Sequence, residues 1–171
     1  MKILESIKLL LNNSDLSFDL SKEVMNEIME GKVTPSQFGS FVTALKIKGE
    51  TPEEIAGMAT VMRTKSLSIS TSSRLLDTCG TGGDNKGTFN ISTASAIVSS
   101  SSGAKVAKHG NRAMSGSTGS ADVLEQLGVK ITLSPDSVKT CIEQIGIGFI
   151  FAQSFHPAMK FAAPLRKEIG I

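Results

Sequence analysis

Two glycine-rich segments constrain what this chain can fold into more than any other feature. The first is residues 79–84, Cys-Gly-Thr-Gly-Gly-Asp, and the second is residues 108–120, Lys-His-Gly-Asn-Arg-Ala-Met-Ser-Gly-Ser-Thr-Gly-Ser. Each follows a short apolar run and precedes a helical pattern, a context that points backbone N–H groups at a ligand such as phosphate. Because the second segment also holds a lysine and an arginine, the pair predicts a ligand that carries more than one phosphate group.

Residues 75–171 alternate short apolar runs with helical patterns. We expect strands at residues 75–78, 104–107, 129–132 and 147–151, and helices at 91–102, 120–127, 134–145 and about 157–167. This alternation predicts a mainly parallel β-sheet with right-handed crossovers, on which ligands bind beyond the carboxyl ends of the strands. Both glycine-rich segments fall at that end. Four strands are few for an independent parallel sheet, so we expect the sequence to be a truncated part of a longer one.

The first 64 residues have the apolar periodicity of four amphipathic helices. Thr34-Pro35-Ser36-Gln37 and Thr51-Pro52-Glu53-Glu54 are capping boxes with proline at the first helical position, and they open the third and fourth helices. A serine-rich stretch at residues 66–73 predicts a hinge. The predicted fold class is therefore α/β: an all-α helical bundle at residues 1–65, a hinge at 66–74, and an incomplete α/β ligand-binding domain at 75–171.

Composition excludes several classes of protein. The net charge is +2, but the first 64 residues hold seven Lys/Arg against nine Asp/Glu and the rest hold eleven against seven, so the glycine-rich segments lie in the basic part. Nucleic acid is a poor candidate ligand, because the chain has no basic run and no Trp or Tyr to stack on bases. No signal peptide and no run of about 18 apolar residues is present, which argues against a membrane protein. Cys79 and Cys141 lack metal-ligand spacing, and we expect a reducing cytoplasm.

The first glycine-rich segment and the helix start that follows it each allow two interpretations. Residues 80–84 could admit a pyrophosphate, with Asp84 on a sugar hydroxyl or a metal, or they could form a turn without a ligand. Residues 90–93, Asn-Ile-Ser-Thr, offer N–H groups and two hydroxyls to an anion, and Ser92 could contact Mg²⁺. Plain N-capping is the commoner explanation of such a cluster in isolation.

The second segment is harder to explain as structure alone. Lys108 and Arg112 could neutralise a diphosphate, and Asn111 could orient a neutral polar group. His109 could act as an acid or base, or it could hold the loop through hydrogen bonds. Arg166 could pair with a substrate carboxylate, although the sequence by itself favours a solvated arginine in the last turn of a helix.

At these residues the chain resembles the anthranilate phosphoribosyltransferase family. The resemblance rests on residues 77–84, on 90–93 and on 108–122, and the helical N-terminal part and serine-rich hinge extend it over the whole chain. It implies transfer of a phosphoribosyl group from phosphoribosyl pyrophosphate to anthranilate with Mg²⁺, and an α/β domain like those of nucleoside phosphorylases and phosphoribosyltransferases. It also implies a homodimer formed through the helical domain, whereas the expectation of a cytoplasmic protein with no nucleic-acid or membrane partner rests on composition. Family members are longer and carry an Asp-Glu pair in their later half, which is missing here, so we expect this sequence to be the N-terminal half.

The resemblance also implies a role for each site residue. Lys108, Asn111 and Arg112 are the expected catalytic residues, Ser92 is the expected Mg²⁺ ligand, and Gly80, Asn111 and Arg166 are expected to contact anthranilate. The residues implied to hold phosphoribosyl pyrophosphate are Gly80, Gly83, Asp84, Thr88, Asn90, Ile91, Ser92, Thr93, Lys108, His109, Gly110, Asn111, Arg112, Ala113, Met114, Ser115, Gly116 and Ser120.

Two rival functions stay open at this stage. A pyrimidine nucleoside phosphorylase has a similar lysine-histidine-glycine loop, but its first loop reads Ser-Thr-Gly-Gly-Val-Gly-Asp, whereas here Asp84 directly follows Gly83. The other rival is a related fold kept as a nucleic-acid-binding or dimerisation module. The intact loops and the weak net charge argue against that module.

Overall fold

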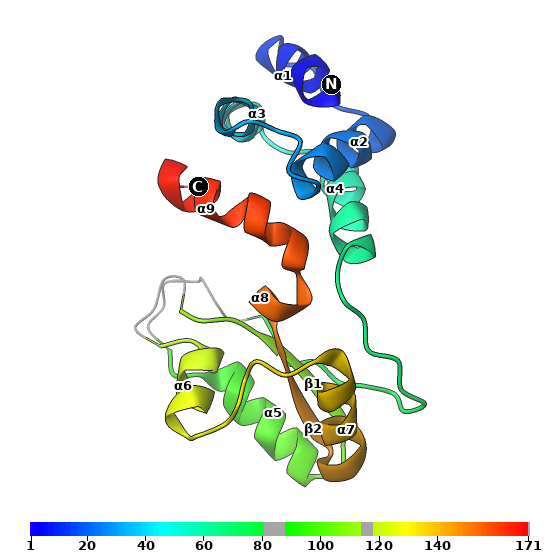
Figure 1. Cartoon of the computed structure of the whole chain (residues 1–171), viewed down its shortest axis with the longest axis vertical. Coiled ribbons are helices and arrows are strands. Elements are labelled where there is room, and N and C mark those ends of the chain that lie inside the picture. The colour runs from blue at the N-terminus through cyan, green and yellow to red at the C-terminus, as the bar shows by residue number, and fades with distance from the viewer. Residues whose placement is uncertain (81–87, 114–117, 171) are drawn as a thin grey trace. The chain divides into compact units, whose positions relative to one another are not determined.

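The computed structural model describes residues 1–80, 88–113 and 118–170 (Figure 1). These residues form two compact units. The helical unit comprises residues 1–66 together with 156–171, and the α/β unit comprises residues 67–155. The first unit is therefore discontinuous in sequence, because the chain returns to it after the second.

The helical unit begins with four α-helices whose ends follow local sequence signals. In α3 and α4 both predicted capping boxes are confirmed: Thr34 and Gln37 exchange hydrogen bonds, as do Thr51 and Glu54. A 3₁₀ helix, η1, and a last α-helix, α9, complete the unit. The elements are α1 Lys2–Leu11, α2 Phe18–Met29, α3 Pro35–Lys48, α4 Pro52–Thr64, η1 Pro157–Phe161 and α9 Ala163–Ile169.

Aliphatic and aromatic side chains from α1, α2 and α3 form the core of this unit. Ile3, Val24 and Phe41 are almost completely buried, and Ala162, which precedes α9, is buried in the same cluster. Helices α2 and α4 pack closely because Gly57 lacks a side chain: a Cβ atom there would lie 2.5 Å from the Phe18 carbonyl oxygen.

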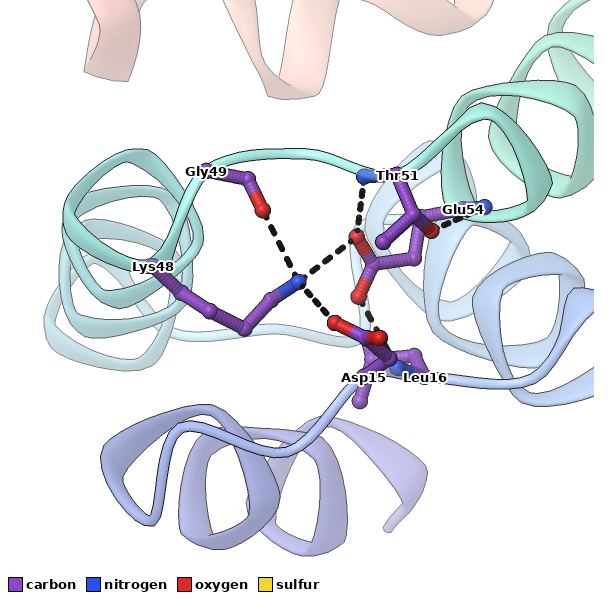
Figure 2. Close-up of polar contacts among 6 residues, drawn as sticks. All are labelled: Asp15, Leu16, Lys48, Gly49, Thr51 and Glu54. Carbon is purple, nitrogen blue, oxygen red and sulfur yellow. Dashed lines mark hydrogen bonds and ion pairs between the residues drawn. The ribbon is translucent and has the colours of Figure 1, made fainter.

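A buried charge cluster joins two loops of the helical unit (Figure 2). The carboxylate of Glu54 is fully buried and accepts hydrogen bonds from the backbone N–H groups of Leu16 and Thr51, both at 2.8 Å. The Lys48 Nζ atom donates to Glu54 at 3.0 Å and to Asp15 at 2.6 Å. Burial opposes ionisation of Glu54, but the two N–H donors and Lys48 outweigh it and hold the pKa of Glu54 below its usual range.

The α/β unit is built around two parallel strands that lie side by side in Figure 1. Strand β1 pairs with β2, with Val106 opposite Ile147. Val106 also forms an isolated parallel bridge with Leu76. Helices α5 and α7 pack against the strands. The elements are α5 Ile91–Ser101, β1 Val106–Gly110, α6 Ser120–Gln126, α7 Pro135–Ile145, β2 Ile147–Phe151 and α8 Ala152–Phe155. The predicted fold class, a helical bundle followed by a parallel sheet with helices, is confirmed.

Several predicted boundaries differ from the observed ones. Residues 129–132 form no strand; Ile131 alone among them is buried, and no strand of the described residues pairs with them. The strand expected at residues 104–107 begins two residues later, the one expected at 75–78 is reduced to the bridge at Leu76, and the helix expected at 157–167 is divided into η1 and α9.

The compact units also differ from the predicted domains in one place. Residues 156–171 were expected in the α/β domain, but the described ones, 156–170, pack with the helical unit. The physical reason is apolar burial: Met159, Ala162 and Leu165 belong to the cluster built by α1, α2 and α3.

Candidate functional site

The first glycine-rich segment leaves the sheet next to the start of α5. The Thr78 hydroxyl donates to the backbone carbonyl of Ser92 at 2.7 Å, which ties the chain after the Leu76 bridge to the first turn of α5. Gly80 has a φ of +145°, a conformation that residues with a Cβ rarely adopt. Thr88 is exposed, and Gly83 and Asp84 lie outside the described residues.

The start of α5 lacks the side-chain cap that would explain its polar cluster as structure. Asn90 occupies the N-cap position but makes no side-chain capping hydrogen bond. The buried Thr93 instead directs its hydroxyl to that of Ser120, 2.9 Å away at the start of α6. The first turns of two helices therefore meet and bring two hydroxyls together, and a helix N-terminus is a position where the helix dipole favours an anion.

Backbone contacts close the base of the second glycine-rich loop. The Asn111 carbonyl accepts a hydrogen bond from the Ala121 N–H at 3.1 Å. A single oxygen of Asp122 accepts from the N–H groups of Ala113 and Gly119, at 2.9 and 2.7 Å. A Cβ atom on Gly119 would overlap the backbone of residues 111–113, so glycine is needed for this close approach. Met114, Ser115 and Gly116 lie outside the described residues.

Arg112 is held by acidic side chains on α6. Its guanidinium forms a two-pronged ion pair with Glu125, lies 3.7 Å from an oxygen of Asp122, and covers the ring of Phe151 at 5.6 Å from the centroid. The hydrogen bonds with Glu125 raise the pKa of Arg112. The N–H donors of Gly119 and Ala113 lower the pKa of Asp122. The predicted phosphate-binding arginine is thus already oriented by two carboxylates.

Lys108 lies differently from what its predicted role required. Its side chain is buried within the unit, and its Nζ atom donates to the His109 carbonyl at 2.8 Å rather than extending into solvent. Burial lowers the pKa of Lys108, and the negative charge of Asp77 opposes that shift. The lysine therefore places a positive charge behind the loop backbone.

Three acidic residues that sequence reasoning did not select organise this region: Asp77, Asp122 and Glu125. A local signal existed for Asp122, because an acidic residue three positions after Gly119 is typical of a helix first turn. None existed for the contacts of Asp77 with His109 or of Glu125 with Arg112, which join residues far apart in sequence. Arg166 lies on α9 in the helical unit, so its expected contact with anthranilate stays a prediction.

Comparison with known proteins assigns both parts of the chain. Residues 72–171 match the glycosyl transferase family, a/b domain, and residues 4–66 match the glycosyl transferase family, helical bundle domain. The chain belongs to this glycosyl transferase family. The two glycosyl transferase matches leave a gap between residues 66 and 72, which coincides with the serine-rich stretch.

Similar curated proteins of this glycosyl transferase family are anthranilate phosphoribosyltransferases. That of Dehalococcoides mccartyi (strain 195) is 63% identical over 169 residues, which are 99% of this chain and 50% of the relative. That of Roseiflexus sp. (strain RS-1) is 57% identical over 171 residues, 100% of this chain and 50% of the relative. The predicted resemblance is confirmed, and the chain spans about half the length of the curated relatives it matches.

Solved structures agree. The anthranilate phosphoribosyltransferase of Thermus thermophilus has a TM-score of 0.88 at 45% identity, covering 97% of this chain and 51% of that one. The Saccharomyces cerevisiae enzyme, in complex with PRPP and Mg, has a TM-score of 0.89 at 28% identity, covering 99% and 51%. Within the described part of the present chain, none of the helices is long and apolar enough to cross a membrane.

Proposed function

We propose that this chain is the N-terminal half of an anthranilate phosphoribosyltransferase. The reaction transfers the phosphoribosyl group of phosphoribosyl pyrophosphate to the amine of anthranilate and releases pyrophosphate, a step of tryptophan biosynthesis. The relatives that align with nearly the whole chain carry this name, and the yeast structural neighbour binds PRPP and Mg. The protein is further proposed to work in the cytoplasm.

One observation carries the proposal: the first turns of α5 and α6 meet through the Thr93–Ser120 hydrogen bond, beside a loop that holds Arg112. Helix N-termini bind anions through unpaired N–H groups and the helix dipole. Asn90 makes no side-chain cap at α5, which weakens the interpretation of this cluster as simple capping. A diphosphate bound here would lie beside the Thr93 and Ser120 hydroxyls and the arginine together.

The residues of the chain would act on the leaving group. As pyrophosphate departs from the anomeric carbon, negative charge grows on its oxygens, and Arg112 and the loop amides would stabilise it. Arg112 has five N–H donors, so it can bind a phosphate while Glu125 still fixes its plane. The buried Lys108 would contribute through its charge rather than by contact.

Asn111, Gly80 and Arg166 are proposed to position anthranilate. The Asn111 side-chain oxygen accepts the Arg112 N–H at 2.9 Å, which would turn the amide NH₂ group of Asn111 toward a substrate. An aromatic amine is scarcely protonated at neutral pH, so the reaction needs no strong general base. The remaining members of the proposed phosphoribosyl pyrophosphate site are those named from the sequence.

Magnesium is compatible with the donor set described here. Ser92 offers a hard oxygen at the start of α5, and the described residues hold no cluster of three or more His, Cys, Asp or Glu that could bind a cation alone. Mg²⁺ typically takes one or two protein oxygens and completes its shell with substrate phosphates and water. When bound, it would neutralise charge on the leaving pyrophosphate.

A homodimer formed through the helical unit is the proposed assembly. Leu4, Leu11 and Ile47 are large apolar side chains exposed on α1 and α3, and a second copy would remove them from water. A sedimentation mass equal to one protomer would exclude this assembly.

The decisive experiment uses the full reading frame that encodes this chain. Purified protein, phosphoribosyl pyrophosphate, Mg²⁺ and anthranilate are mixed, and loss of anthranilate fluorescence is followed. Arg112→Ala should raise KM for phosphoribosyl pyrophosphate by roughly 10-fold or more, and Arg166→Ala should mainly raise KM for anthranilate. Arg74→Ala, at an exposed position in the hinge, is the matched control.

Three outcomes would count against the proposal. Equal effects of the Arg112 and Arg166 variants on both substrates would remove the division of roles between them. Absence of turnover in the unmodified protein would reject the transferase. Phosphorolysis of thymidine or uridine instead would assign the nucleoside phosphorylase alternative.

A further inference from the structure

Asp77 occupies a position between the two glycine-rich loops that no role described so far explains. Its Oδ1 atom accepts a hydrogen bond from the Cys79 N–H at 3.1 Å, at the start of the first loop. The same atom accepts another from the His109 N–H at 3.2 Å, near the start of the second loop. One carboxylate oxygen therefore joins the start of the first loop to His109, which lies 32 residues after Asp77 in sequence.

The second of these bonds replaces a bond of the parallel ladder. The Leu76 N–H donates to the Lys105 carbonyl, and the Ala107 N–H donates to the Leu76 carbonyl, both at 2.9 Å. If the ladder continued, the next N–H on this edge, that of His109, would donate to the carbonyl of Thr78. It donates to Asp77 instead. The side chain thus ends the ladder and lets the chain after Thr78 turn away into the first loop.

The surroundings of Asp77 favour the ionised form of its carboxyl group. Desolvation of the carboxyl group by its neighbours opposes ionisation, but the donors at Cys79 and His109, together with the ammonium of Lys108, outweigh it and lower the pKa of Asp77. The carboxylate is thus ionised at neutral pH and supplies a counter-charge to the buried Lys108.

We propose that Asp77 is a positioning residue for the phosphoribosyl pyrophosphate site, which fixes Cys79 and His109, near the starts of the two glycine-rich loops, relative to each other so that one ligand can contact both segments. This inference rests on the proposed function. A ligand that bridges two loops binds best when their separation is set before it arrives, since otherwise ordering the loops reduces its affinity. Asp77 does not need to touch the substrate to have this effect.

The test compares three variants of the full reading frame: Asp77→Ala, Asp77→Asn and Asp136→Ala. Alanine removes the acceptor of both N–H groups, whereas asparagine keeps an oxygen in the same place without its charge. Asp136 is an exposed acidic residue in the first turn of α7 and serves as the matched control. For each variant, KM is measured for both substrates, and binding of inorganic pyrophosphate with Mg²⁺ is measured by calorimetry.

Asp77→Ala should weaken phosphoribosyl pyrophosphate and pyrophosphate roughly 10- to 100-fold and leave KM for anthranilate within about threefold. Asp77→Asn should recover most of the loss, and Asp136→Ala should match the unmodified protein. Amide hydrogen exchange at His109 should accelerate in Asp77→Ala, which reports the lost contact directly.

Three results would overturn the inference: unchanged pyrophosphate affinity in Asp77→Ala, an Asn variant as impaired as the Ala variant, or equal changes in KM for both substrates, as a general loss of stability would produce. If Asp77→Ala does not fold, the test rests on the pyrophosphate affinity of Asp77→Asn and on amide hydrogen exchange at His109 in that variant. Pyrophosphate binding needs no turnover, so an inactive unmodified protein would reject the proposed function and still leave the role of Asp77 measurable.

Discussion

Carboxylates surround the region of this chain that is proposed to bind an anion. Asp77, Asp122 and Glu125 each accept hydrogen bonds from groups that the sequence would assign to phosphate: loop N–H groups and Arg112. Acidic residues so close to a diphosphate would repel it if they were unengaged. Because they are bonded to the loop itself, their main effect is to hold donors in place. The orientation of the N–H donors, more than the number of lysine and arginine side chains, would then determine the affinity for a diphosphate.

A different carboxylate, Glu30 at the end of α2, gives a pH-dependent prediction. Its oxygens lie 2.6 Å from the Nζ of Lys32 and 2.7 Å from that of Lys65, and these hydrogen bonds lower the pKa of Glu30 to about 2 from the usual 4.5. A depressed folded-state pKa stabilises the fold above pH 4.5, and that contribution is lost as the pH falls from about 4.5 to about 2.

The measurement is an NMR titration of the Glu30 carboxyl carbon, together with urea unfolding of the unmodified protein and of Glu30→Gln across this range. The stability difference between the two proteins should shrink as the pH falls from 4.5 toward 2. A Glu30 carboxyl that titrates near 4.5 in the folded protein would contradict the ion pairs.

At the scale of elements, close helix packing in the helical unit depends on Gly57 more than on Gly39. Gly57 in α4 faces α2, and a Cβ atom there would lie 2.5 Å from the Phe18 carbonyl oxygen and 2.8 Å from the Ser21 Cβ. Gly39 in α3 has room, since its Cβ would have Ile169 as its nearest contact at 3.9 Å. Because both positions are helical, comparing the two substitutions separates the effect of packing on stability from the effect of helix propensity.

Gly57→Ala should therefore lower the free energy of unfolding by about 1–3 kcal/mol, because α2 and α4 must move apart. Gly39→Ala should raise it by about 0.5–1 kcal/mol, because alanine is the better helix former. Urea unfolding followed by circular dichroism measures both. A Gly57→Ala substitution that does not lower the free energy of unfolding would show that α2 and α4 do not pack as closely as described.

The sequence predicted elements well wherever the signal lies in neighbouring residues. Both capping boxes, and the helix that begins at Pro135, were predicted to within a residue or two. Features that depend on distant partners were missed: residues 129–132 form no strand because no described neighbour pairs with them, and Lys108 is buried by surroundings that no local pattern encodes. In the site, the order of strands and helices along the chain already places the helix starts at Thr93 and Ser120 at the same end of the sheet. The bond from the His109 N–H to Asp77 cannot be predicted from that order.

At the scale of the whole molecule, the helical unit is assembled from both ends of the described chain. Residues 1–66 supply four helices, and residues 156–170 supply η1, Ala162 and α9. Ala162 is 3% exposed within the cluster that includes Ile3 and Phe41, so this last segment is part of the core rather than a surface addition.

Cutting the chain once between Ser68 and Ser73 should therefore leave its two pieces associated. A site-specific protease sequence inserted there provides the cut, and residues 156–170 on the second piece should keep it bound to residues 1–66. Gel filtration without denaturant should give one species, and denaturing electrophoresis should give two. Ala162→Asp, which places a charge in the core, is the control that should release the pieces. Separation of the unsubstituted pieces would contradict the packing.

The discontinuous helical unit also affects the order in which the protein can fold during synthesis. Translation delivers residues 1–66 first, yet Met159 and Ala162, which complete their core, follow only after all of residues 67–155. At typical elongation rates that interval is roughly 5–20 s. For that time the apolar surface that awaits them faces water and any chaperone at the ribosomal exit. The unit that begins to emerge first is thus completed only after the whole of residues 67–155 has been made.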